Sequence, residues 1–123
     1  MTITIPGEPR TKKNSQRIVM AGGRPVVLPS KQYKEYRECC LWRIPGWQKT
    51  RINYPVNMKC VYYMATKRNV DLVNLIEATC DILVDAGVIA DDNSKIVVSH
   101  DGSRVKLDRD NPRAEITITR MSQ

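Results

Sequence analysis

Six of the chain's 13 acidic residues lie within residues 70–92, VDLVNLIEATCDILVDAGVIADD, and no Lys or Arg lies among them. The six are Asp71, Glu77, Asp81, Asp85, Asp91 and Asp92. Carboxylates that share one site need a counter-cation or raised pKa values. Mg²⁺ prefers such hard oxygen ligands and also binds substrate phosphates. The stretch therefore predicts a metal site if Asp71 and the Asp91–Asp92 pair meet.

Each of these acids also has an ordinary structural interpretation. Asp71 alone is typical of a helix N-cap, where the helix dipole favours a negative charge. The run 91–94, Asp-Asp-Asn-Ser, is typical of a solvated turn. Asp81 and Asp85 fit a solvent-exposed helix face, and Glu77 fits the same face.

The charge of the chain is unevenly placed. Residues 1–70 hold 14 Lys or Arg and three acids, whereas residues 71–123 hold six and ten, which leaves a net charge of +7. A basic half suggests a polyanionic partner such as nucleic acid.

The elements that must position the acids begin with a helix from Asp71 to about Ala86, with Gly87 just beyond its end. Its apolar residues fall on one arc and its acids on the opposite one. Sixteen helical residues rise about 24 Å, so Asp71 and the 91–92 pair meet only if the chain folds back along the helix. We expect the carboxylates of Asp71 and Asp92 to share one cation in a cleft rimmed by the N-terminal loop.

The rest of the sequence predicts a single domain over residues 1–123. A second helix is expected over 31–43, with Ser30 as its N-cap and Pro45 after its end. Strands are expected at 2–5, 55–65, 95–100, 103–107 and 113–119, with a hairpin over 17–28. The fold class is α+β (mixed α/β), with a mixed sheet of about four to six strands and two main helices.

The four cysteines, Cys39, Cys40, Cys60 and Cys80, form no C-x-x-C pair, and the chain has one histidine. This composition favours buried thiols over a zinc site or disulfides. No apolar run approaches the ~20 residues that span a membrane. The N-terminus does not resemble a signal peptide. We therefore expect a cytoplasmic protein with no membrane association.

In order along the chain, these motifs resemble the RusA-like Holliday junction resolvases, small endonucleases that phages and prophages often carry. "ITIPGEPRTKKNSQR" is similar to the family's N-terminal strand and loop, and "VLPSKQYKEYRE" to its strand-to-helix junction. "KRNVDLVNLIEATCDILVDAGVIADDNSKIV" is similar to its catalytic segment, and "ITIT" to its last strand.

The resemblance implies roles for particular residues. Asp71 matches the first family aspartate, Asn74 the asparagine of the motif, and Asp92 the later essential aspartate, with Asp91 beside it. Two positions depart from the pattern. The second aspartate of the motif is Val73 here, and the family's helix lysine is Glu77, which could restore a carboxylate.

The implied reaction is hydrolysis of a phosphodiester in a four-way DNA junction, by a water that Mg²⁺ activates, with Mn²⁺ as a substitute. Asp71 and Asp92 would be ligands, and Asp91 or Glu77 would complete the set. Family members are dimers, and a C₂ homodimer presents two sites to a two-fold junction. The residues implied to bind DNA are Lys12, Lys13, Asn14, Arg17, Lys67 and Arg68. The expected setting is a bacterial cytoplasm, from a bacterial or phage gene.

Two other functions remain open. The substitutions at Val73 and Glu77 favour a catalytically impaired protein of the same fold that only binds branched DNA. A small RNA-binding protein would explain the basic half but would leave the acids unused.

Overall fold

The computed structural model describes residues 1–12, 17–28 and 30–122. Within these residues, two helices and a short 3₁₀ helix lie among seven strands. The helical elements are α1 (Lys31–Arg43), η1 (Gly46–Gln48) and α2 (Leu72–Asp85). The strands are β1 (Thr2–Pro6), β2 (Arg17–Ala21), β3 (Arg24–Leu28), β4 (Val56–Met64), β5 (Val97–Ser99), β6 (Arg104–Leu107) and β7 (Arg113–Arg120).

A five-stranded mixed sheet organises the chain. Its order is β1-β7-β4-β5, and β6 also pairs with β4. β7 is antiparallel to both of its neighbours, whereas β5 and β6 run parallel to β4. Parallel neighbours need a crossover, and α2 provides it between β4 and β5. The predicted α+β class, with two helices on a mixed sheet, is confirmed.

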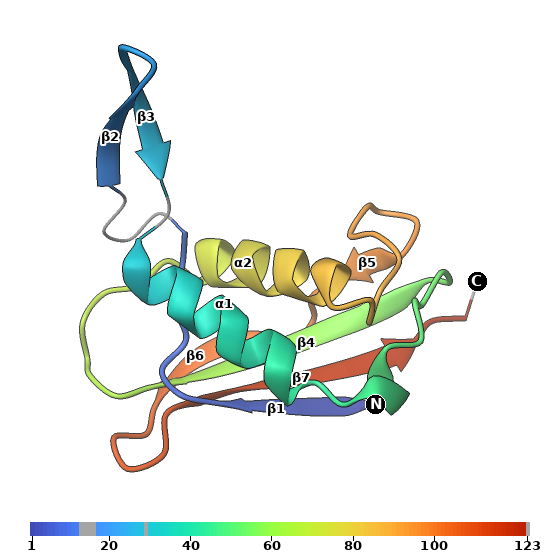
Figure 1. The fold of residues 1–123 in the computed structure, drawn as a ribbon. Helices are drawn as coiled ribbons and strands as arrows, with labels where there is room; N and C mark the ends of the chain where they lie inside the picture. Colours follow the sequence, from blue (N-terminus) through green and yellow to red (C-terminus); the bar gives the residue numbers. More distant parts are fainter. Residues whose placement is uncertain (13–16, 29, 123) are drawn as a thin grey trace.

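Both helices cover the same face of this sheet (Figure 1). Alternate residues of β4 point toward them, and Met58, Cys60 and Tyr62 are fully buried. From α2, Leu75 and Leu83 are at most 1% exposed. Burying a side chain of this size contributes about 1.5–3 kcal/mol, so this layer holds α2 in register over the sheet.

One buried polar network lies between β4 and α2. The hydroxyls of Tyr62 and Thr79 are 2.7 Å apart, and Thr79 donates to the Leu75 carbonyl at 2.9 Å. Burial raises the pKa of the Tyr62 hydroxyl, so it stays protonated. The network leaves these hydroxyls paired, which is what a buried polar group requires.

The thiols are buried except for Cys39, which is exposed and so differs from the expectation for all four. Burial raises the pKa values of Cys40 and Cys60 to about 11 and that of Cys80 to about 12. Since the thiolate is the reactive form, these three should be inert at neutral pH.

The native protein should therefore react with a thiol reagent at one cysteine, Cys39, at pH 8. After unfolding in urea it should react at all four. A colorimetric disulfide reagent counts the thiols in both states. Rapid labelling of two or more thiols in the native protein would show that the buried layer opens readily.

The hairpin formed by β2 and β3 stands apart from the main sheet (Figure 1). Gly22 and Gly23 form its turn with φ values of 58° and 77°, a region that favours glycine at both positions. Ile18 and Met20 are 73% and 70% exposed on one side of the ribbon. The hairpin therefore adds little to the core that positions the acidic residues.

Candidate active site

Asp71 lies at the start of α2 and caps it, as the sequence predicted. Its side chain accepts a hydrogen bond of 2.9 Å from the backbone N–H of Val73, and the carboxylate is exposed. One oxygen is therefore used for capping, and the other faces solvent. Asn74, also in the first turn of α2, is partly buried.

Asp91 and Asp92 lie in the turn that follows α2, and both are exposed. Asp91 accepts hydrogen bonds from the Asp92 N–H at 2.8 Å and from the Asn93 amide at 3.1 Å. These bonds, the backbone one first, lower the pKa of Asp91. The Asp92 side chain is exposed, which leaves its carboxylate accessible to an external ligand.

The two ends of α2 keep these carboxylates apart. The helix has 14 residues and rises about 21 Å. Figure 1 shows the turn before β5 near the C-terminal end of α2, whereas Asp71 caps the other end of this helix. The negative charge of Asp92 contributes to the raised pKa of Cys80, nine residues after Asp71. The turn thus lies beside the C-terminal half of α2.

A metal site that gathers these acids was expected here, and its ligand set stays a prediction. Among residues 1–12, 17–28 and 30–122, no three His, Cys, Asp or Glu side chains are grouped closely enough to hold a metal. The helix places Asp71 at its start, and the chain reaches Asp91 and Asp92 only beyond its end. Exposed carboxylates have the right chemistry for Mg²⁺.

Asp81 and Asp85 are paired with cations and are not simply a solvated face. Lys12 donates to Asp81, and the Arg37 guanidinium contacts Asp85 at 2.7 Å. The hydrogen bond to Asp81 is the main cause of the raised pKa of Lys12. These pairs attach the N-terminal loop and α1 to α2, so the two acids have a structural role.

Glu77 is exposed on α2, one turn before Asp81. Its charge also raises the pKa of Lys12. A lysine side chain from the N-terminal loop thus lies near helix position 77, where the resemblance led us to expect a lysine on the helix itself. Val73 is 70% exposed in the first turn, so a carboxylate at that position would also face solvent.

The expected DNA-binding residues fall into two groups. Lys67 and Arg68 are exposed in the loop that leads from β4 to Asp71, and Arg68 lies 4.0 Å from Glu8. This loop places two cations at the Asp71 end of α2. Lys13 and Asn14 lie outside the described residues, and Arg17 begins β2.

A scan against protein families matches residues 6–119 to endodeoxyribonuclease RusA. The chain belongs to the RusA family. This family comprises metal-dependent Holliday junction endodeoxyribonucleases, and the chain is therefore a nuclease whose substrate class is junction DNA. No curated protein matches the sequence. The match covers both helices, the strands from β2 to β6, all but the last residue of β7 and all of the acids discussed above, whereas β1 lies outside it except for Pro6.

RusA membership bears out the resemblance seen in the motifs, while the ligand set stays a prediction. The sequence did not predict the pairing of Lys12 with Asp81 or of Arg37 with Asp85.

Neither helix among the described residues is long and apolar enough to cross a membrane.

Proposed function

We propose that this RusA-family chain is a Mg²⁺-dependent resolvase that acts as a homodimer and nicks two strands of a four-way DNA junction. The observation that carries the proposal is the family match over residues 6–119, together with exposed carboxylates at both ends of α2. Mn²⁺ should substitute, because it accepts the same oxygen ligands.

The separation of Asp71 from Asp92 supports a site built from two chains. Each chain would offer Asp71 at one end of α2 and Asp91–Asp92 at the other. In a C₂ pair, the Asp71 end of one chain can meet the Asp92 end of its partner, which gives two identical sites. Glu77 remains a candidate for the ligand that Val73 does not supply.

When bound, the cation would activate water and neutralise the charge that develops on the phosphate. The chain's own residues do the rest. Lys67 and Arg68 would contact phosphates next to Asp71 and so fix the register of the DNA without reading its sequence. The hydrogen bonds to Asp91 hold the turn that carries Asp92.

The alternative is a protein of the same fold that binds branched DNA without cutting it. The apolar Val73 favours it, because the family has an aspartate at that position. The two functions separate in one experiment: incubation of the protein with a synthetic four-way junction and Mg²⁺ or Mn²⁺. Linear duplex is the control substrate, and chelation of the metal is the control condition.

Paired nicks in the junction alone, lost on chelation, would support the resolvase. Tight junction binding without nicks under any metal condition would support the binding protein. The proposal also places the reaction in the cytoplasm of a bacterium. There the chain's four free thiols stay reduced.

Replacing both Lys67 and Arg68 by Ala should weaken binding to every DNA form. The slope of log K against log salt should fall by up to about 1.8, at about 0.9 per lost phosphate contact. Filter binding at several salt concentrations measures it. The control is a double variant with Lys59→Ala on β4 and Arg120→Ala on β7. It removes the same two positive charges from the sheet and leaves the loop before Asp71 unchanged. An equal loss of slope in that control would mean that the loop before Asp71 has no special contact with DNA.

A further inference from the structure

The chain's only two tryptophans are among its most exposed side chains. Trp42, in the last turn of α1, is 89% exposed, and Trp47, in η1, is 75% exposed. Tryptophan carries a large apolar surface that folding usually buries. Two such side chains left in solvent, five positions apart, indicate a binding surface and not a packing role.

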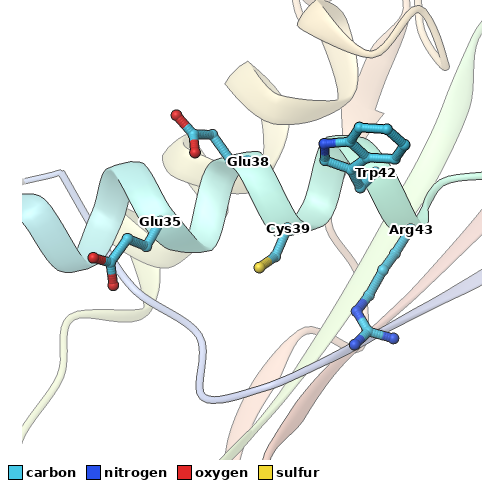
Figure 2. A pocket seen from close by; sticks show the side chains of 5 residues that line it. All are labelled: Glu35, Glu38, Cys39, Trp42 and Arg43. Atoms are coloured by element: carbon cyan, nitrogen blue, oxygen red, sulfur yellow. The ribbon is translucent and has the colours of Figure 1, made fainter.

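Trp42 stands between two hollows in the surface of the protein. One hollow, of about 470 Å³, is lined by Glu35, Glu38, Cys39, Trp42 and Arg43. Figure 2 shows Trp42 and Arg43 leaving the end of α1 in different directions. The other hollow, of about 320 Å³, is lined by Leu41, Trp42, Ile44 and Lys49, so a cation and an indole share it with no carboxylate.

The stretch of sequence that contains Lys49 of the second hollow carries only positive charges. No acidic residue occurs between Glu38 and Asp71, although six Lys or Arg do. Three of them, Arg43, Lys49 and Arg51, are exposed and follow closely on Trp42. Glu35 and Glu38 lie on the other side of Trp42, so an anionic ligand is favoured on the Lys49 side.

This segment is physically joined to the turn that carries Asp91 and Asp92. The Arg51 N–H donates to the Gly87 carbonyl, and Ile52 exchanges hydrogen bonds with Val88 and Ala90, each at 2.9 Å. The hydrogen bonds form a parallel bridge between Ile52 and Ile89. The hydrogen bonds therefore bring the basic aromatic segment close in space to the residues just before Asp91 and Asp92.

Arg51 adds a second sign of function. Its φ is 49°, and it is the only described residue other than glycine with a positive φ. A left-handed conformation costs a non-glycine residue about 1–2 kcal/mol. A glycine would relieve the strain but would remove the exposed guanidinium, so the strained backbone keeps a cation at this place.

We propose that Trp42 and Trp47 form a stacking platform for unpaired DNA bases at the branch point, with Lys49 and Arg51 holding the adjacent phosphates. Base stacking on aromatic side chains, beside a basic groove, is how single-stranded DNA is bound without sequence preference. In an open four-way junction the last base pair of each arm lacks a stacking neighbour, so opening of that pair would offer its bases to an aromatic platform. This inference rests on the proposed function for its ligand, but it concerns a surface distinct from the carboxylates.

A second copy of the chain is the competing occupant, because tryptophan is also enriched in protein interfaces. The cores of such interfaces are depleted in charged residues. Lys49 shares the hollow with Trp42, and Arg43 and Arg51 are exposed within nine residues of Trp42 in the sequence. This charge fits a polyanion better than a like-charged copy.

Intrinsic fluorescence tests the platform directly, because Trp42 and Trp47 supply all of the tryptophan signal. An oligo-dT strand, added in EDTA so that no cleavage occurs, should quench the emission of the full chain. Trp42→Phe and Trp47→Phe, each leaving one tryptophan, should show which indole the bases contact. Free tryptophan amide corrects for non-specific quenching.

Trp42→Ala should weaken oligo-dT binding by about 5- to 100-fold, as expected for the loss of one stacked base. Leu107→Ala, on β6, removes a side chain that is 42% exposed and should bind normally. Sedimentation of the same variants reports their oligomeric state. Quenching together with weakened binding in Trp42→Ala supports the platform.

Absent quenching, or a Trp42→Ala protein that dissociates yet binds oligo-dT normally, overturns it. Cleavage of a junction by the same preparation, measured with Mg²⁺, is a separate readout. Cleavage without quenching would refute the platform and leave the proposed function standing. Quenching without cleavage would do the reverse.

Discussion

Asp71→Asn is expected to reduce junction cleavage at least about a hundredfold while the protein remains folded. Asn caps a helix about as well as Asp, so its side chain can still accept from the Val73 N–H. What is lost is one negative charge from the proposed ligand set. Loss of an outer partner of a metal site costs about 10–100-fold in affinity or activity, so loss of a ligand should cost more.

The measurement is the single-turnover cleavage rate of a labelled junction over a range of Mg²⁺ concentrations, with circular dichroism as the check on folding. Glu77→Gln is the matched variant on the same helix. If Glu77 is a ligand, its variant should lose as much rate as Asp71→Asn and need more Mg²⁺. If the charge of Glu77 serves only to offset the charge of Lys12, the Glu77→Gln protein should cleave at a nearly normal rate. An Asp71→Asn protein that cleaves at the wild-type rate would remove Asp71 from the active site.

Two inactive variants, Asp71→Asn and Asp92→Asn, should recover activity when they form a mixed dimer. If each site takes Asp71 from one chain and Asp92 from its partner, the mixed dimer contains one intact site and one doubly altered site. Cleavage should therefore rise from background to a level set by a single site. The product should be a junction nicked on one strand.

Co-expression with two different affinity tags isolates the mixed dimer, and a gel that separates nicked from resolved junctions reads the product. The control is the variant with both substitutions in one chain, paired with wild type. If the sites are shared between chains, each of its sites contains one substitution and this dimer should stay inactive. If both carboxylates acted within one chain, the mixed dimer of the two single variants would contain two damaged sites. It would then stay as inactive as either parent.

The sequence was most informative about local structure. Ser30 and Asp71 cap their helices as expected, and α1 spans the predicted residues 31–43. Capping and hydrophobic periodicity depend on neighbours in the chain, so a single sequence carries them. β5 is shorter than predicted, because only Val97–Ser99 follows the edge of β4 before the chain leaves it.

The candidate site was harder to predict because it depends on contacts between distant residues. The acids of α2 were recognised, but which of them are neutralised was not. Lys12 and Asp81 are 69 positions apart, and Arg37 and Asp85 are 48 apart. Nothing in the spacing of α2 indicates those partners. The separation of Asp71 from Asp92 follows from helix length, which the sequence did give, and from the chain's course after Ala86, which it did not.

The length of α2 has a kinetic consequence if its two ends serve different sites of a dimer. A monomer would then hold only halves of two ligand sets and would be inactive at any metal concentration. Below the dissociation constant of the dimer, the rate of cleavage would fall with the square of the chain concentration. With a helix of 14 residues between the two half-sites, dilution alone would thus inactivate the protein, without an inhibitor or a modification.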